Sequence, residues 1–141
     1  MKTYLTRVER ETSAETDLVD LTAEVHKAVA ASGADVGLDT VFVPGSTASI
    51  TTIEYEGGVV GDLRKAIERL APENMHYDHD ARWGDGNGYS HVRAALLGPS
   101  ISVPIAGGKP SLGTWQQVLL CDFDNRPRTR EVLISVVGES S

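Results

Sequence analysis

The stretch that decides the fold is residues 116–137, which read QQVLLCDFDNRPRTREVLISVV. Two apolar runs, Gln116 to Phe123 and Arg130 to Val137, are separated by the polar segment Asp124 to Pro127. Apolar runs bounded by Asp, Asn and Pro are typical of two strands joined by a turn. The pattern therefore predicts that the chain ends in a β-hairpin.

The segments before this hairpin include both strand and helix patterns, without a regular β/α alternation. Residues Lys2 to Glu9 alternate between two faces, so they are predicted to form an opening strand. A helix is expected to begin at a cap on Thr16 or Asp17 and to end near Gly33, because apolar residues recur there at intervals of three and four. Residues 38–43 and 48–53 are predicted to form two strands or one strand kinked at a turn. The further predicted elements are a helix at 59–70, a short helix at 91–97 and a strand at 101–105, in which Pro104 indicates an edge or a bulge.

Together these elements predict an α+β fold with a mixed, mostly antiparallel sheet and helices packed on one face. The composition fits a folded domain, since 40% of the residues are hydrophobic and 23% are charged. The sequence contains no long low-complexity stretch that would serve as a linker, and no internal repeat. One domain spanning residues 1–141 is therefore expected.

The formal net charge of −7 and the single cysteine exclude several kinds of binding partner and structural site. An acidic chain lacks the surplus of Lys and Arg that binds nucleic acid or an anionic membrane, so neither partner is expected. Cys121 alone excludes an intrachain disulfide and a zinc site built from several cysteines of one chain. Because no apolar signal segment or membrane span is recognisable, the cytoplasm is the expected location.

Residues 73–90 are rich in His, Asp, Gly and Asn, and a polar segment of this length inside a compact domain indicates a functional loop. His79 and His91 are candidate ligands for a divalent metal, and a third ligand would come from Asp85, Glu54 or a neighbouring chain. Two histidines in a polar loop are also common as plain surface residues, so both interpretations stay open. The Asp-Gly-Asn-Gly turn directly before His91 likewise fits either simple turn formation or binding of an anion.

Three arginines follow one another at every second residue, so Arg126, Arg128 and Arg130 share one face of an extended strand. Folding of the predicted hairpin would place Asp124 near Arg128 and Asp122 near Arg130 as cross-strand ion pairs. The same guanidinium groups are also suited to bidentate binding of phosphate. Structural pairing and phosphate binding are therefore both consistent with this cluster.

Taken in order, several short motifs resemble those of the YjbQ-like family across nearly the whole chain. The most specific pieces are an LGTWQ sequence and a DGN sequence followed by a histidine. The matching segments are Phe42-Val43-Pro44-Gly45-Ser46-Thr47-Ala48, Ile53-Glu54, Tyr77-Asp78-His79, Asp85-Gly86-Asn87-Gly88-Tyr89-Ser90-His91, Leu97-Gly98-Pro99-Ser100, Leu112-Gly113-Thr114-Trp115-Gln116 and Asp122-Phe123-Asp124.

This resemblance implies an α+β homotrimer with its polar motifs in a cleft near the subunit contacts. It also implies a thiamine-phosphate synthase-like transferase, which joins hydroxymethylpyrimidine diphosphate to a thiazole phosphate as a secondary activity. Family members often carry histidines where this chain has Gly45 and Tyr89. An inherited site for a divalent metal, zinc or magnesium, would then keep only His79 and His91 of the family's histidines, and it would be weak, rebuilt with Asp85 or Glu54, or lost.

The leading hypothesis is a YjbQ-type enzyme that acts on a small phosphorylated molecule, and the alternative is a non-catalytic protein that binds a metabolite or a metal. Convergence of the histidines with Glu54 or Asp85 in one cleft would favour the enzyme. The residues assigned to catalysis are His79, His91, Glu54 and Asp85. The residues assigned to substrate binding are Thr47, Asn87, Gln116, Arg128 and Arg130.

Overall fold

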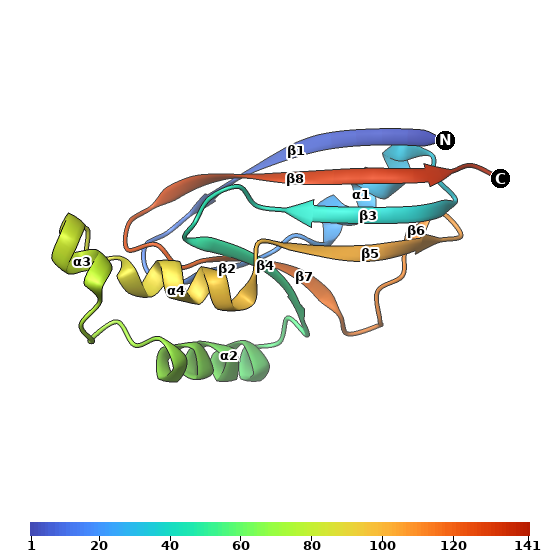
Figure 1. Ribbon diagram of the computed structural model, residues 1–141. Helices are drawn as coiled ribbons and strands as arrows, with labels where there is room; N and C mark the ends of the chain where they lie inside the picture. The colour runs from blue at the N-terminus through green and yellow to red at the C-terminus, as the bar shows by residue number, and fades with distance from the viewer.

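A computed structural model describes residues 1–141, and its strands form two antiparallel sheets that pack against each other (Figure 1). The five-stranded sheet has the order β1 (Lys2–Thr12), β8 (Arg128–Glu139), β3 (Val36–Phe42), β5 (Ser100–Ala106) and β6 (Lys109–Pro110). The three-stranded sheet has the order β2 (Asp17–Asp20), β7 (Gln117–Asp122) and β4 (Ala48–Ile53). The predicted α+β class with antiparallel strands is confirmed.

Four helices complete the fold: α1 (Thr22–Ser32), α2 (Gly57–Leu70), α3 (Asp78–Trp83) and α4 (Gly88–Leu97). Helix α1 packs into the core between the two sheets, whereas α2 and α4 cover the opposite face of the three-stranded sheet. Figure 1 shows α2, α3 and α4 gathered at the end of the molecule that lies away from both termini. No helix is long and apolar enough to cross a membrane.

Strand β7 forms the middle of the core because both of its faces are buried. Val118 and Leu120 pack toward the five-stranded sheet, and Leu119 and Cys121 pack toward α2 and α4. All four side chains are fully buried, which explains why this segment is a continuous apolar run rather than an alternating one. Strand β8 alternates instead, because only its inner face is covered.

The predicted terminal hairpin is wrong, because β7 and β8 belong to different sheets. Strand β8 pairs with β1 from Thr12↔Arg128 to Lys2↔Gly138 and with β3 on its other side. Both edges of β8 are therefore occupied, and β7 pairs with β2 and β4 instead. The polar segment 124–127 is thus a crossing between the sheets, although its composition is that of a hairpin turn.

The predicted first helix begins too early. Residues Asp17–Asp20 form strand β2, and Leu18 is buried beside β7 instead of lying on a helix. The helix starts at Thr22, whose backbone N–H and hydroxyl both donate to the Asp20 carboxylate, and it ends at Gly33 as predicted. A short strand with alternating apolar residues can match a helical spacing over four residues, which explains the error.

The remaining elements are close to the predicted ones. The opening strand extends to Thr12, and the second helix starts at Gly57 with the Glu56 side chain accepting hydrogen bonds from its first turn. The predicted loop at 73–90 contains α3 and the first residues of α4. Pro104 lies on β5, whose outer edge is covered by only two residues of β6, as expected for an edge position.

Asp39 is a carboxylate in an apolar part of the core. It lies on β3 between Val103 of β5 and Val136 of β8, and it is fully buried. Neither carboxylate oxygen has a hydrogen-bond partner. Burial raises the pKa of Asp39 from 3.8 to about 6, because the charged form loses its hydration without gaining a partner.

The first prediction concerns the pH dependence of stability. Asp39 binds a proton more tightly in the folded chain than in the unfolded chain, so its ionisation destabilises the fold as pH rises through about 6. The free energy of unfolding of Asp39→Asn minus that of the wild type should therefore rise by about 2 kcal/mol from about pH 4 to pH 7. Urea unfolding at both pH values measures this gain. The exposed Asp62→Asn variant is the control, and equal pH profiles for all three proteins would refute the prediction.

Candidate functional site

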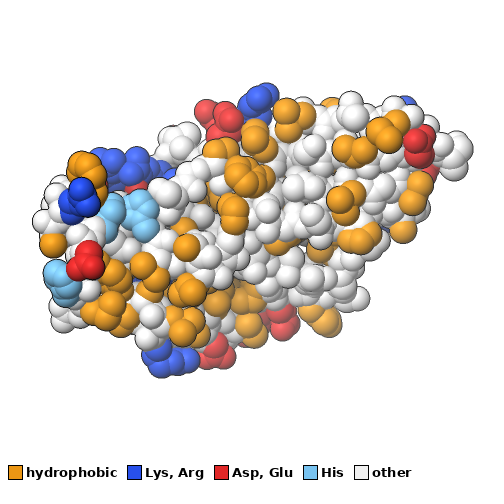
Figure 2. Space-filling view, in the orientation of Figure 1, with side chains coloured by type: hydrophobic (Ala, Val, Ile, Leu, Met, Phe, Trp, Pro, Cys, Tyr) orange, Lys and Arg blue, Asp and Glu red, His pale blue; other side chains and the backbone are white.

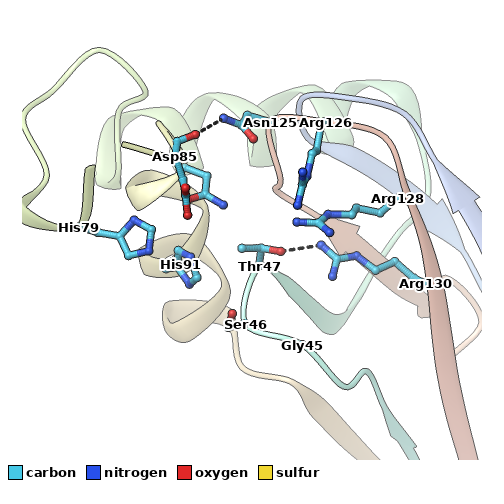
Figure 3. A pocket seen from close by; sticks show the side chains of 11 residues that line it. Gly45, Ser46, Thr47, His79, Asp85, His91, Asn125, Arg126, Arg128 and Arg130 are labelled. Atoms are coloured by element: carbon cyan, nitrogen blue, oxygen red, sulfur yellow. Dashed lines mark hydrogen bonds between the residues drawn. The ribbon is translucent and has the colours of Figure 1, made fainter. Parts of the chain in front are cut away.

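A polar pocket of about 480 Å³ opens where the crossing between the sheets meets α3, α4 and the segment before β4. Figure 3 shows His79 and His91 on one wall and Arg126, Arg128 and Arg130 on the facing wall. None of the lining residues is hydrophobic. The lining residues are Gly45, Ser46, Thr47, His79, Asp85, Asn87, His91, Asn125, Arg126, Arg128 and Arg130.

Two of the arginines are held by carboxylates at the end of β7. Arg130 donates from Nε and Nη2 to the two carboxylate oxygens of Asp122, both at 2.8 Å. Arg128 donates from Nε to Asp124 at 2.6 Å. Asp122, Asp124 and Arg130 are buried, and Arg128 is half-buried. The predicted pairing of Asp124 with Arg128 and of Asp122 with Arg130 is confirmed, although it links two sheets instead of two strands of a hairpin.

Both carboxylates are stabilised in their charged form. Burial alone would raise the pKa of Asp122, but hydrogen bonds from Arg130, Thr12 and the Asp124 backbone lower it below its usual value. Burial likewise opposes the shift at Asp124, where hydrogen bonds from Arg128 and from the Asn125 backbone lower the pKa. Both arginines therefore face stable anions at neutral pH.

The carboxylates leave part of each guanidinium free for another partner. Nη1 of Arg128 and Nη1 of Arg130 make no hydrogen bond within the chain. Arg126 has neither an ion-pair partner nor a hydrogen bond, and its side chain is exposed. All three groups line the same pocket, so they offer N–H donors of a kind that bind phosphate oxygens.

Thr47 and Asn87 connect the arginine wall to the rest of the site. The Thr47 hydroxyl accepts from Arg130 Nη2 at 2.6 Å and donates to Asp124 at 3.4 Å. The Asn87 side-chain N–H donates to Asp124 at 3.3 Å, and its Oδ1 is buried without a partner. Asn125 donates to the Asp85 carbonyl at 3.0 Å, which ties the loop before α4 to the crossing between the sheets. These contacts connect the arginine wall to the segment before β4 and to the loop before α4.

The two histidines come from different helices and touch each other. His79 lies on α3 and His91 on α4, with ring centroids 4.4 Å apart. Helix α3 is held against α4 because the Asp80 carboxylate accepts a hydrogen bond from the Gly88 backbone at 2.8 Å. The structure thus brings both imidazoles and Asp85 into one cleft, which is the convergence expected for a site that performs chemistry.

A metal site is less complete than the anion site. No group of three His, Cys, Asp or Glu side chains in the chain is arranged to hold a metal ion. Tyr89, where the resemblance to the family would place a histidine, is buried, and the Arg93 guanidinium lies 4.8 Å from the centre of its ring. His79 and His91 therefore lack a third ligand from this chain, and metal binding by them stays a prediction.

Two residues assigned to the site lie elsewhere. Glu54 follows the far end of β4, and Gln116 precedes the far end of β7, whereas the pocket lies at the opposite ends of both strands. At about 3.3 Å per residue, the length of β4 separates Glu54 from Thr47 by roughly 20 Å. Gln116 bonds to Thr52 and to the Gly113 backbone. The structure therefore brings neither residue to the histidines.

Four lining residues lie outside the sets assigned to catalysis and substrate binding: Gly45, Ser46, Asn125 and Arg126. Asn125 and Arg126 belong to the segment predicted as a hairpin turn, where their side chains would extend into solvent. Because the segment instead crosses between the sheets, both side chains line the pocket. The spacing of the arginines at every second residue was the sequence feature that pointed to Arg126, because it grouped this residue with Arg128 and Arg130, and all three line the pocket.

Comparison with known proteins gives consistent matches over nearly the whole chain. The family model described as UPF0047 protein YjbQ-like matches residues 6–139. A UPF0047 protein of Archaeoglobus fulgidus is 36% identical over 126 residues, which cover 89% of this chain and 95% of that protein. A UPF0047 protein of Mycobacterium bovis is 40% identical over 120 residues, which cover 85% of this chain and 91% of that protein.

Solved structures show the same fold. A YbjQ-like protein of unknown function from Sulfolobus solfataricus matches with a TM-score of 0.88 at 29% identity, covering 97% of this chain and 99% of the other. A conserved protein of the yjbq/upf0047 family from Clostridium acetobutylicum matches with a TM-score of 0.86 at 32% identity, covering 94% and 99% of the two chains.

The second prediction concerns the buried ion pair. Arg130→Ala should cost about 3–5 kcal/mol in free energy of unfolding, because it leaves the Asp122 carboxylate buried without its main partner. Arg7→Ala, which breaks an exposed pair with Glu131, should cost only ~0–1 kcal/mol. Urea unfolding compares the two variants with the wild type. Losses of equal size would show that the Arg130 pair contributes no more than a surface contact.

Proposed function

This chain belongs to the YjbQ-like UPF0047 family, and we propose that its polar pocket binds the phosphate or diphosphate group of a small metabolite. The observation that carries the proposal is the set of free guanidinium N–H groups on Arg126, Arg128 and Arg130, all facing one pocket. A planar guanidinium fits two phosphate oxygens at once, and three of them supply enough donors for a diphosphate.

The arrangement of charge supports an anion over a neutral ligand. Asp122 and Asp124 neutralise Arg130 and Arg128 from behind, whereas Arg126 has no counterion within the chain. The Asp85 carboxylate also lines the pocket, on the histidine side. A bound molecule with an anionic group toward the arginines and a hydrogen-bond donor toward Asp85 would satisfy both walls.

We also propose that His79 and His91 exchange protons with the bound molecule. The histidines face the arginines across the pocket, so a phosphorylated molecule held by the arginines lies within reach of an imidazole (Figure 3). Imidazole is suited to proton transfer near neutral pH. The specific reaction to examine first is the joining of hydroxymethylpyrimidine diphosphate to a thiazole phosphate. Its departing diphosphate would be stabilised by the arginine wall.

The alternative function is binding without catalysis, and it would use the same arginines.

Assembly as a homotrimer and participation of zinc or magnesium stay predictions. For the trimer, exposed Leu5, Leu38, Phe42 and Val137 on the outer face of the five-stranded sheet offer an apolar surface where copies would meet.

The third prediction tests the anion site. Replacing Arg126 or Arg128 by Lys keeps the charge but removes the planar pair of donors, so pyrophosphate affinity should fall about tenfold or more. Isothermal titration of each variant with pyrophosphate, with and without Mg²⁺, gives the affinities. Arg7→Lys, on the outer face of the five-stranded sheet, is the matched control and should bind like the wild type. Unchanged affinity in both pocket variants would remove the arginines from the site.

The fourth prediction separates catalysis from binding. His91→Ala should lower the rate of the thiamine-type reaction about 100-fold, because a protonated imidazole would donate its proton to the departing diphosphate as the C–O bond breaks. Pyrophosphate affinity and melting temperature should stay close to the wild type. A large drop in melting temperature would indicate a structural histidine. A wild-type chain that binds pyrophosphate but shows no turnover would favour the non-catalytic alternative.

A further inference from the structure

We infer that the phosphorylated molecule carries a small apolar or aromatic group, and that this group lies in a groove beside α4. The inference rests on the proposed phosphate site and names the class of molecule that fits it. The groove has a volume of about 260 Å³ and adjoins the polar pocket. Its walls are formed by Ala48, Ala94, Ala95 and Pro99, together with residues that it shares with the pocket.

The groove exists because its side chains are small. Ala94 and Ala95 of α4 lie near Ala48 at the start of β4, and larger side chains at these positions would fill the space between helix and strand. The backbone of this region is already hydrogen-bonded within the chain. The Pro99 carbonyl accepts from Val43 N–H at 3.0 Å, and the Gly98 carbonyl accepts from Ile50 N–H at 3.1 Å. These groups need no polar partner from a ligand, so the groove favours apolar contact.

The groove and the pocket meet at Gly45, Ser46 and His91, which line both. A molecule with its phosphate at the arginines and an apolar group in the groove must pass these three residues. The bond between the phosphate and the apolar group would therefore lie beside His91. In Figure 2, histidine side chains likewise lie between Lys and Arg side chains and a region of hydrophobic side chains.

The size of the groove limits the apolar group. A buried cavity on the order of 150 Å³ holds a benzene molecule in another protein, so a single ring or a short branched chain fits here. The polar pocket has no hydrophobic lining and would not favour such a group. The geometry therefore points to a phosphate ester of a small apolar alcohol or phenol. The polar pocket would bind its phosphate, and the adjoining groove would bind its apolar group.

The test compares phenyl phosphate with methyl phosphate, which carry the same ester phosphate but differ in the apolar group. Wild-type protein should bind phenyl phosphate about tenfold more tightly than methyl phosphate, because the ring leaves water on entering the groove. Ala95→Phe and Ala95→Gln, which place a larger side chain in the groove, should remove this preference and keep the affinity for methyl phosphate. Ala30→Phe, on the exposed face of α1, should keep the preference.

Each outcome decides between the two proposals. If methyl phosphate and pyrophosphate bind but phenyl phosphate binds no more tightly than methyl phosphate, the groove inference is overturned and the anion site stands. The same holds if both Ala95 variants still bind phenyl phosphate more tightly than methyl phosphate. If neither pyrophosphate nor methyl phosphate binds, the proposed function fails and the groove inference fails with it. Light scattering is measured for every variant. A change of assembly mass in the Ala95 variants alone would show that the groove is a contact between copies, which also overturns the inference.

Discussion

The buried ion pair between Asp122 and Arg130 is the contact on which the site depends. Asp122 ends β7 in one sheet and Arg130 lies near the start of β8 in the other, and both side chains point into the space between the sheets. An ion pair in this position is costly unless its hydrogen bonds are complete. Asp122 accepts from Arg130 twice, from the Thr12 hydroxyl and from the Asp124 backbone, so its charge is well compensated.

This pair shows why structural and ligand-binding roles need not exclude each other. A guanidinium has five N–H groups, and Asp122 and Thr47 use only those on Nε and Nη2 of Arg130. Because the guanidinium is planar and rigid, the bonds from Nε and Nη2 to Asp122 also fix the position of Nη1, which makes no hydrogen bond itself. Arg128 is arranged in the same way by Asp124. The carboxylates therefore fix the arginines in the unliganded chain, which would lower the entropy lost on binding the proposed anion.

The sequence predicted local features better than the partners of each strand. The ion pairs of Arg128 and Arg130 were predicted from a hairpin that does not form. They are present because the short segment 124–127 still brings the start of β8 back beside the end of β7. The sheets to which β7 and β8 belong were predicted wrongly, since a polar segment of Asp, Asn and Pro has the same composition in a hairpin turn and in a crossing between sheets. Pairing depends on β1 and β3, which lie far from β8 in the sequence. The same limitation explains why Gln116 and Glu54 were grouped with residues at the other ends of their strands.

Gly45 connects the shape of the pocket to its chemistry. Its φ of +129° is a conformation that side chains other than glycine rarely adopt, and a Cβ at this position would lie 3.1 Å from Arg130 Nη1. A histidine here, as the family resemblance suggests for other members, would strain the backbone and crowd the arginine. In this chain the absent side chain leaves room for Arg130 to reach the pocket, and Gly45 also joins the pocket to the groove. Gly45 therefore supplies no third imidazole to His79 and His91, and it leaves space beside Arg130 Nη1 for the proposed anion.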